Sequence, residues 1–338
     1  MRQSLPLLCC CSYPQSLSLG PFEVRQNVIP NVITLRIESL GGAVALVDPC
    51  VVYLTVTTLR EFLQITRKAL TEADVLEPYL EAEVMLTDVL QIPRHRLYTI
   101  QDQKLSVCVE ATLSQIVRKR LKREPLAYIL GHREFYGIDL LVGPQVMVPR
   151  QETELLVERA MLIAMKLKSE GSLVAVDVGT GHGGIGINLA LQLPWISIIA
   201  TDVSPDALDI ARLNIARFKV GDRITLKQGN LLEGIEGPID LIVGNLPYIP
   251  GHRIQNLQPE VRWEPRIALD GGFDGLDIIR RLLCQSVGKL APDGAILLEI
   301  DHNQSEALRQ FGIEFFPGAT IHIEKDFEGL DRIFILER

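Results

Sequence analysis

The stretch that decides the fold is SLVAVDVGTGHGG, residues 172–184. Its apolar run over 173–178 predicts a buried strand, and the glycine-rich turn DVGTGHGG (177–184) follows directly. Such a turn between a strand and a helix lets the backbone approach a ligand closely. In an open α/β sheet that ligand lies outside the carboxyl ends of the strands. The stretch therefore predicts a cofactor site at one edge of a sheet.

Around this turn, short β-rich runs alternate with helical stretches. The runs that predict strands are 173–178, 196–201, 223–227, 239–243 and 295–300. The stretches that predict helices are 153–168, 205–218, 276–290 and 305–311. Alternation of this kind predicts a parallel sheet with helices on both faces. No helix of useful length separates 319–324 from 332–336, so these two strands are expected to form an antiparallel edge pair.

Two cofactors fit the glycine-rich turn. Gly179, Gly181 and Gly184 satisfy G-x-G-x-x-G, and Asp202, roughly 20 residues further on, can hold a ribose, as in dinucleotide sites. Asp177 opens the pattern Asp-x-Gly-x-Gly, which is equally typical of S-adenosylmethionine sites when an acidic residue ends the second strand. The turn alone leaves both cofactors open.

The N-terminal half differs in character from this region. Residues 1–56 carry few charges and four of the six cysteines, and we expect a poorly ordered extension. From about 57 to 125, apolar residues recur at steps of three and four, which predicts helices, the last of which is ended by Pro125. Residues 94–133 hold nine Lys and Arg against three Asp and Glu, either a solvated helix face or a docking surface for an acidic or RNA-associated partner.

Composition limits the classes of protein that the chain can be. With 338 residues, 47% hydrophobic and 22% charged, it can build about two globular domains at roughly 150 residues each. Six cysteines, three of them adjacent, make neither a disulfide framework nor a zinc spacing. No apolar run reaches the length of a membrane span. A net charge of −8 argues against bulk nucleic-acid binding.

The chemical motif follows the fourth predicted strand: Asn245, Leu246, Pro247 and Tyr248. Methyl transfer from a sulfonium needs alignment more than acid–base catalysis. The side-chain oxygen of Asn245 and the main-chain carbonyl of Leu246 can accept the two N–H bonds of a carboxamide and direct its nitrogen toward the methyl group. Tyr248 can pack on the flat amide.

At this point a family resemblance becomes clear. The residues NLPY (245–248) are similar to the Asn-Pro-Pro-Tyr motif of amino-methyltransferases. Further stretches resemble the peptide chain release factor glutamine N5-methyltransferases, the HemK/PrmC family. They are EPLAYILG (124–131), EFYG (134–137), VPRQETE (148–154), the segment 264–276 and KDFEGLDR (325–332). The resemblance covers roughly residues 57–338, and several separated motifs in order make it specific.

The resemblance implies the fold and its division into domains. It implies an α/β class I S-adenosylmethionine-dependent methyltransferase, Rossmann-like, with a seven-stranded, mostly parallel sheet and a small N-terminal helical domain. Residues 57–131 would form the helical substrate-binding domain, 132–150 a β-hairpin linker and 151–338 the methyltransferase domain. S-adenosyl-L-methionine would be the donor. The acceptor would be the glutamine of the Gly-Gly-Gln motif of class I release factors, modified at its side-chain nitrogen.

The resemblance also assigns site residues. The catalytic set that would hold the glutamine is Asn245, Leu246, Pro247 and Tyr248. The cofactor-binding set is Asp177, Gly179, Thr180, Gly181, His182, Gly183, Asp202, Asn230, Leu231 and Asn245, with no metal. Pro149 and Arg150 would lie near the site, with Arg150 either functional or in a structural salt bridge.

The chain departs from the family pattern at positions that matter for the site. Leu246 stands where Pro is usual, but a backbone carbonyl performs the assigned role, so Leu can still supply it. Asn230 replaces Asp, so an amide, which can both donate and accept, would make the adenine contact. His182 replaces a small residue; it can touch the cofactor carboxylate, although a solvent-facing loop position is the expectation.

Other functions stay open from the sequence. They are an adenine N6 methyltransferase on nucleic acid, which can use the same motif, a non-catalytic S-adenosylmethionine-binding module, and a dehydrogenase. We expect a cytoplasmic monomer that has release factors as partners, no stably bound nucleic acid and no membrane association.

Overall fold

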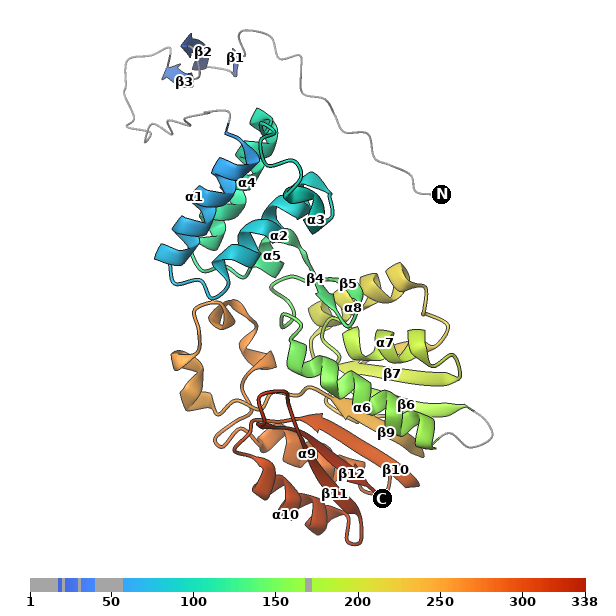
Figure 1. Cartoon of the computed structure of the whole chain (residues 1–338). Helices are drawn as coiled ribbons and strands as arrows, with labels where there is room; N and C mark the ends of the chain where they lie inside the picture. Colours follow the sequence, from blue (N-terminus) through green and yellow to red (C-terminus); the bar gives the residue numbers. More distant parts are fainter. Residues whose placement is uncertain (1–17, 20–21, 30–31, 40–56, 168–171) are drawn as a thin grey trace. The chain divides into compact units, whose positions relative to one another are not determined.

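The computed structural model describes residues 18–19, 22–29, 32–39, 57–167 and 172–338, the first three ranges by backbone alone (Figure 1). The chain divides into two compact units, Met1–Leu121 and Lys122–Arg338. Most of 1–56, the predicted poorly ordered extension, lies outside the described residues. The backbone described there forms three antiparallel strands: β1 (Ser18–Leu19), β2 (Phe22–Ile29) and β3 (Val32–Ser39).

The first unit contains a cluster of helices. They are α1 (Leu59–Glu72), α2 (Pro78–Leu90), α3 (Arg94–Leu97) and α4 (Val107–Arg120). A capping box starts α1, in which the Thr58 side chain accepts from the Glu61 N–H and the Glu61 carboxylate accepts from the Thr58 N–H. The buried apolar residues of the four helices form the core of this unit. None of the helices in the described ranges is long and apolar enough to cross a membrane.

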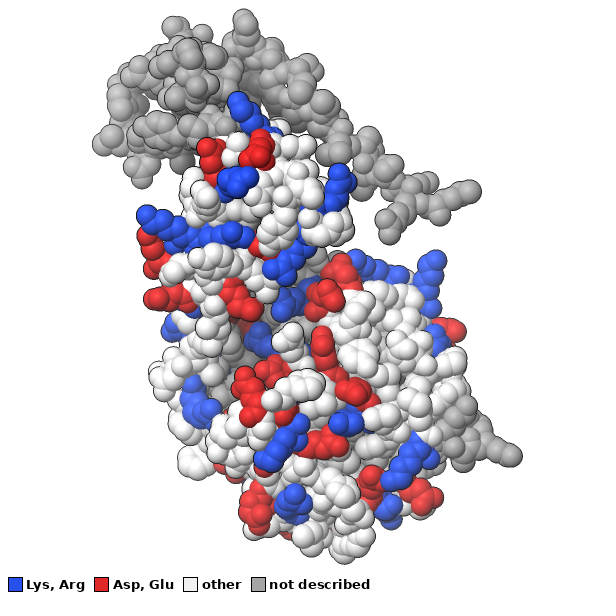
Figure 2. Space-filling view, in the orientation of Figure 1, with Lys and Arg blue, Asp and Glu red and all other residues white. Residues whose placement is uncertain are grey.

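Part of the basic stretch 94–133 is used within the protein itself. Arg120, buried in the first unit, donates to Glu81 at 2.6 Å. In the second unit Arg123 donates to both carboxylate oxygens of Glu260, at 2.6 and 2.8 Å. Figure 2 shows acidic and basic side chains interspersed over the face in view. These pairings favour a structural role for that part of the stretch over a free cationic surface.

The second unit is built on a seven-stranded sheet in the order β11-β12-β10-β9-β6-β7-β8. Its strands are β6 (Leu173–Val178), β7 (Ile196–Asp202), β8 (Ile224–Gln228), β9 (Ile239–Gly244), β10 (Leu290–Glu299), β11 (Thr320–Lys325) and β12 (Asp331–Glu337). The first five are mutually parallel. At one edge β12 pairs antiparallel with β10, and β11 pairs antiparallel with β12. The predicted parallel sheet and its antiparallel edge pair are confirmed.

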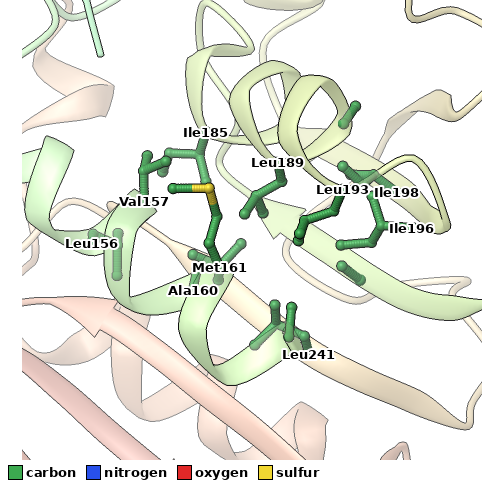
Figure 3. Close-up of a cluster of buried hydrophobic side chains, with 14 of the residues drawn as sticks. Leu156, Val157, Ala160, Met161, Ile185, Leu189, Leu193, Ile196, Ile198 and Leu241 are labelled. Atoms are coloured by element: carbon green, nitrogen blue, oxygen red, sulfur yellow. The ribbon is translucent and has the colours of Figure 1, made fainter. Parts of the chain in front are cut away.

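Helices cover both faces of this sheet. They are α6 (Gln151–Leu167), α7 (Gly184–Gln192), α8 (Pro205–Phe218), α9 (Asp277–Ser286) and α10 (Ser305–Phe315). Three short 3₁₀ turns, over Gly251–Asn256, Val261–Trp263 and Arg266–Ala268, lie between β9 and α9. Side chains of α6, α7 and β7 interdigitate on one face, beside Leu241 of β9 (Figure 3). The next residue, Ile242, packs on the other face with α9 and α10. This alternation follows from the two-residue period of a strand.

A short hairpin precedes the sheet. After α5 (Leu126–Leu130), β4 (His132–Phe135) pairs antiparallel with β5 (Ile138–Leu141), within the predicted linker. Buried Asn214 of α8 attaches it to the glycine-rich turn. Its side chain accepts from the Leu141 N–H at 2.8 Å and donates to the carbonyls of Leu141 and His182 at 3.0 and 2.9 Å. One amide group thus fixes the hairpin against the cofactor loop.

Some predicted boundaries were wrong for local reasons. The helix predicted over 276–290 ends at Ser286, because Gly288 has a φ of +79° and β10 already starts at Leu290. In the first unit, α4 ends at Arg120, ahead of Arg123, whose φ is +66°. The chain therefore leaves the helix before it reaches Pro125.

We predict that Asn214→Ala lowers the free energy of unfolding by ~2–4 kcal/mol, because it leaves buried backbone groups without partners. Urea titration of the purified chain measures the effect. Asn256→Ala, at an exposed position, is the control and should stay within ~0.5 kcal/mol of wild type. If Asn214→Ala lowered the free energy of unfolding no more than the control does, Asn214 would not be fixing the hairpin to the glycine-rich turn.

Candidate active site

The candidate site lies where the strand order reverses, between β6 and β9. The strands β7 and β8 continue from β6 in one direction, and β10 continues from β9 in the other. A cavity of about 280 Å³ opens at the carboxyl ends of these strands. Its lining comes from the loops that follow β6, β7, β8 and β9, and from the linker around Pro149. This is the position at which open α/β sheets bind ligands.

The buried carboxylate of Asp177 holds the glycine-rich turn. Its Oδ2 accepts from the Thr180 hydroxyl at 2.7 Å and from the Gly186 N–H at 3.0 Å. Its Oδ1 is buried with no hydrogen-bond partner, and burial raises the Asp177 pKa to about 6. Gly179 and Gly181 have φ values of +69° and +54°, a region that glycine enters at little cost.

Not every residue of the turn faces the cavity. Gly179, Thr180, Gly181 and His182 line it, whereas Asp177 and Gly183 do not. Gly183 caps α7 with a φ of +82°. Asp177 and Gly183 therefore shape the turn from outside the lining.

Asp202 ends β7 and lines the cavity. One carboxylate oxygen accepts from the Gly181 N–H and the other from the Ser204 N–H, both at 2.9 Å. Burial raises its pKa. A carboxylate has about four lone-pair sites, so Asp202 keeps capacity for two further donors, such as the neighbouring hydroxyls of a ribose.

His182 is not the solvent-facing residue that we expected from the sequence. It is 9% exposed, and its ring lies edge-on to Phe135 with centroids 5.9 Å apart. Burial lowers its pKa to about 4, so the ring is neutral at pH 7. Its Nδ1 accepts from the Gly184 N–H at 3.0 Å, which puts the ring proton on Nε2. The neutral ring contributes to the cavity wall.

The segment after β8 gives the cavity another side. Asn230 and Leu231 both line it. Leu231 is buried with a φ of +61°, an uncommon conformation for a bulky side chain. The next residue is held by Gln285, whose side chain accepts from the Leu232 N–H at 2.8 Å. The strained backbone is thus fixed by packing and by a contact from α9.

The four residues that follow β9 do not all face the cavity. Asn245, Leu246 and Pro247 line the cavity. The Leu246 side chain is buried against the turn, so close that a Cβ built on Gly179 would lie 2.9 Å from its Cδ2. Tyr248 is not among the lining residues, and its hydroxyl donates to Glu299 at 3.0 Å. Only the first three residues of the motif therefore meet at the cavity.

Two further residues determine how Asn245 is held. Its Nδ2 donates to the Thr153 hydroxyl at 2.9 Å, and that hydroxyl donates to Glu299 at 2.6 Å. Thr153 lies in the first turn of α6 and Glu299 at the end of β10. Sequence reasoning did not single out either residue. The available signals were the position of Thr153 in VPRQETE and of Glu299 at a carboxyl strand end.

Arg150 makes the structural contact that the sequence left open. Its guanidinium donates to Glu264, whose side chain is 1% exposed. The pair connects the linker to the 3₁₀ segment beyond β9, and neither residue lines the cavity. This geometry favours the structural interpretation of Arg150.

The chemistry of the lining defines the ligand that it fits. Asp202 offers acceptors for paired hydroxyls, and Val203, Leu231 and Ile278 offer apolar surface for a flat ring. The glycine backbone leaves room that side chains would fill. Among the described lining residues, Asp202 and Arg281 place one charge of each sign at the cavity. The lining fits a nucleoside that carries a charged tail.

Comparisons with known proteins agree with this arrangement. The family model of the PrmC N-terminal domain matches residues 61–131, and that of the methyltransferase small domain matches 156–261. A release factor glutamine methyltransferase of Moorella thermoacetica is 37% identical over 282 residues, covering 83% of this chain and 99% of that protein. One from Geobacter sulfurreducens is 39% identical over 279 residues, covering 82% and 95%.

We predict that His182→Gln flattens the pH dependence of stability between pH 6.5 and 4. In this window the unfolded chain protonates the histidine and the folded chain does not, so wild type loses stability as the pH falls. The pKa difference corresponds to ~2–3 kcal/mol at pH 4.5. Denaturant titrations of both proteins at pH 7, 5.5 and 4.5 measure it. If the free energies of unfolding of the two proteins changed in parallel with pH, His182 would not be a buried, neutral residue in the folded chain.

Proposed function

Because the chain belongs to the family of release factor glutamine methyltransferases, we propose that it methylates the glutamine of the Gly-Gly-Gln motif in peptide chain release factors. The methyl group would pass from the sulfonium of S-adenosyl-L-methionine to the side-chain amide nitrogen, with S-adenosylhomocysteine as the leaving group and one amide proton released to solvent. Class I release factors are then its protein partners. We further propose that it works as a cytoplasmic monomer without stably bound nucleic acid.

The orientation of Asn245 is the observation that carries the proposal. Since Nδ2 is engaged by Thr153, the side-chain oxygen is left to accept a hydrogen bond at the cavity. An amide nitrogen is a poor nucleophile because its lone pair is delocalised. Two acceptors, Asn245 Oδ1 and the Leu246 carbonyl, would bind its two N–H groups and favour positive charge on the nitrogen in the transition state.

The cofactor residues follow from the lining. We propose that Gly179, Thr180, Gly181 and His182 surround the methionine part, that Asp202 binds the ribose hydroxyls and that Asn230 and Leu231 flank the adenine. Asp177 and Gly183 would support the turn from outside the cavity. S-adenosylmethionine supplies an electrophilic methyl group on a sulfonium, and the residues around Asn245 align the acceptor with it.

Pro247 and Tyr248 complete the proposed acceptor site by different means. Pro247 biases the preceding residue toward extended backbone, which helps to present the Leu246 carbonyl. Tyr248 would act through its contact with Glu299, because the hydroxyl points to that carboxylate. The helices of residues 57–131 would serve as the substrate-binding domain.

We predict that wild type transfers label from S-adenosylmethionine to an unmodified release factor, and that Asn245→Ala lowers kcat by ~10²–10³ through loss of one aligned acceptor. Gln192→Ala removes an exposed carboxamide at the far end of α7 and should leave transfer unchanged. Mass spectrometry of the tip peptide locates the methyl group.

Each competing function has its own outcome in this experiment. Label on nucleic acid in place of protein would identify an adenine methyltransferase. Tight cofactor binding with no transfer to either acceptor would identify a non-catalytic module. Tight binding of NADH would indicate a dehydrogenase.

A further inference from the structure

We propose that Thr153 and Glu299 are positioning residues that fix which end of the Asn245 carboxamide faces the acceptor, and so make the site select an amide over a carboxylate. This inference rests on the proposed function and deepens it. It assigns the discrimination between glutamine and glutamate to a buried chain of hydrogen bonds, outside the four-residue motif.

The direction of each hydrogen bond follows from the groups involved. The Thr153 hydroxyl has a single hydrogen, which it gives to Glu299 Oε2 at 2.6 Å. Toward Asn245 it can then present only a lone pair. The group 2.9 Å from it must therefore be the NH₂ of Asn245, and the oxygen must point elsewhere.

Glu299 secures this direction because both of its oxygens are occupied. Tyr248 donates to Oε1 at 3.0 Å while Thr153 donates to Oε2. Glu299 is 1% exposed, so no solvent can replace either donor at little cost. A carboxylate only accepts hydrogen bonds, which forces both hydroxyls to donate.

The fold places these groups together independently of the motif. Leu298 of β10 pairs with Gly244 of β9, so that Glu299 comes alongside Asn245 in the parallel register. Thr153 arrives from the first turn of α6, 5% exposed and part of the cavity wall. Three separate elements thus converge on one side chain.

Selectivity follows from the charge that Asn245 presents. A glutamine offers N–H groups to Asn245 Oδ1, whereas a glutamate would place an oxygen against it and bind poorly. If Asn245 could rotate by half a turn, its NH₂ would face the acceptor and would favour the glutamate. The hydrogen-bond chain prevents that rotation, so it sets the ratio of the two affinities.

The test measures binding of two release factors, one with Gly-Gly-Gln and one with Gly-Gly-Glu, in the presence of S-adenosylhomocysteine. We expect wild type to prefer the glutamine form by ~10–100-fold. In Thr153→Val, which keeps the side-chain shape but loses the hydroxyl, the preference should fall to within ~3-fold. Thr153→Ser should restore it. Both release factors dock through the same surface, so its contribution cancels in the ratio of the two affinities. A general loss of fold would weaken both affinities and would not change that ratio.

Turnover provides the second readout. Thr153→Val should lower kcat by ~10–100-fold with the affinity for S-adenosylhomocysteine unchanged. In Glu299→Gln the new amide can either donate or accept at each of the two oxygen positions, so the preference for the glutamine form should be lost in part. This variant replaces Thr153→Val in the test if Thr153→Val does not fold. Thr225→Val, at an exposed position of β8, is the matched control and should match wild type.

The outcomes separate the two proposals. If wild type methylates the glutamine but Thr153→Val and Glu299→Gln keep the full preference, the positioning role is overturned while the proposed function stands. If wild type does not methylate the glutamine at all, the proposed function fails and this inference fails with it.

Discussion

The parallel pairing of β6 with β9, at the point where the strand order reverses, is the constraint on which the site depends. It sets the end of β6 beside the end of β9, so closely that a Cβ on Gly244 would lie 2.7 Å from the Val178 carbonyl. The glycine-rich turn and the Asn245 segment therefore share one cavity. A donor bound over the first and an acceptor held by the second would meet there without any domain movement within this unit.

Several carboxylates near the site are buried in this unit. Burial raises the pKa values of Asp177, Asp202 and Glu299 above their usual range. Each charge is costly without a partner, and Asp177 Oδ1 has none in the described structure. Of these three carboxylates only Asp202 lines the cavity, where Arg281 is the other charged lining residue. Asp177 and Glu299 act on the site indirectly, through the groups that they hydrogen-bond.

Much of this could be predicted from sequence because the signals are local. The short apolar runs identify the buried strands, and the glycines at 179 and 181 identify the turn. Thr153 and Glu299 could not be predicted in the same way, since they lie 146 positions apart and meet only through the sheet register. The sequence places His182 in a loop and predicts exposure. It is buried because the hairpin brings the ring of Phe135 against it, a contact between distant residues.

The proposed chemistry requires Asn245 to present its oxygen to the acceptor nitrogen. A crystal structure of the chain with S-adenosylhomocysteine and a Gly-Gly-Gln release factor measures this directly. We expect a distance of about 2.7–3.2 Å between Asn245 Oδ1 and the glutamine nitrogen, with that nitrogen facing the sulfur. A glutamine bound away from Asn245, or held with its oxygen toward the sulfur, would contradict it.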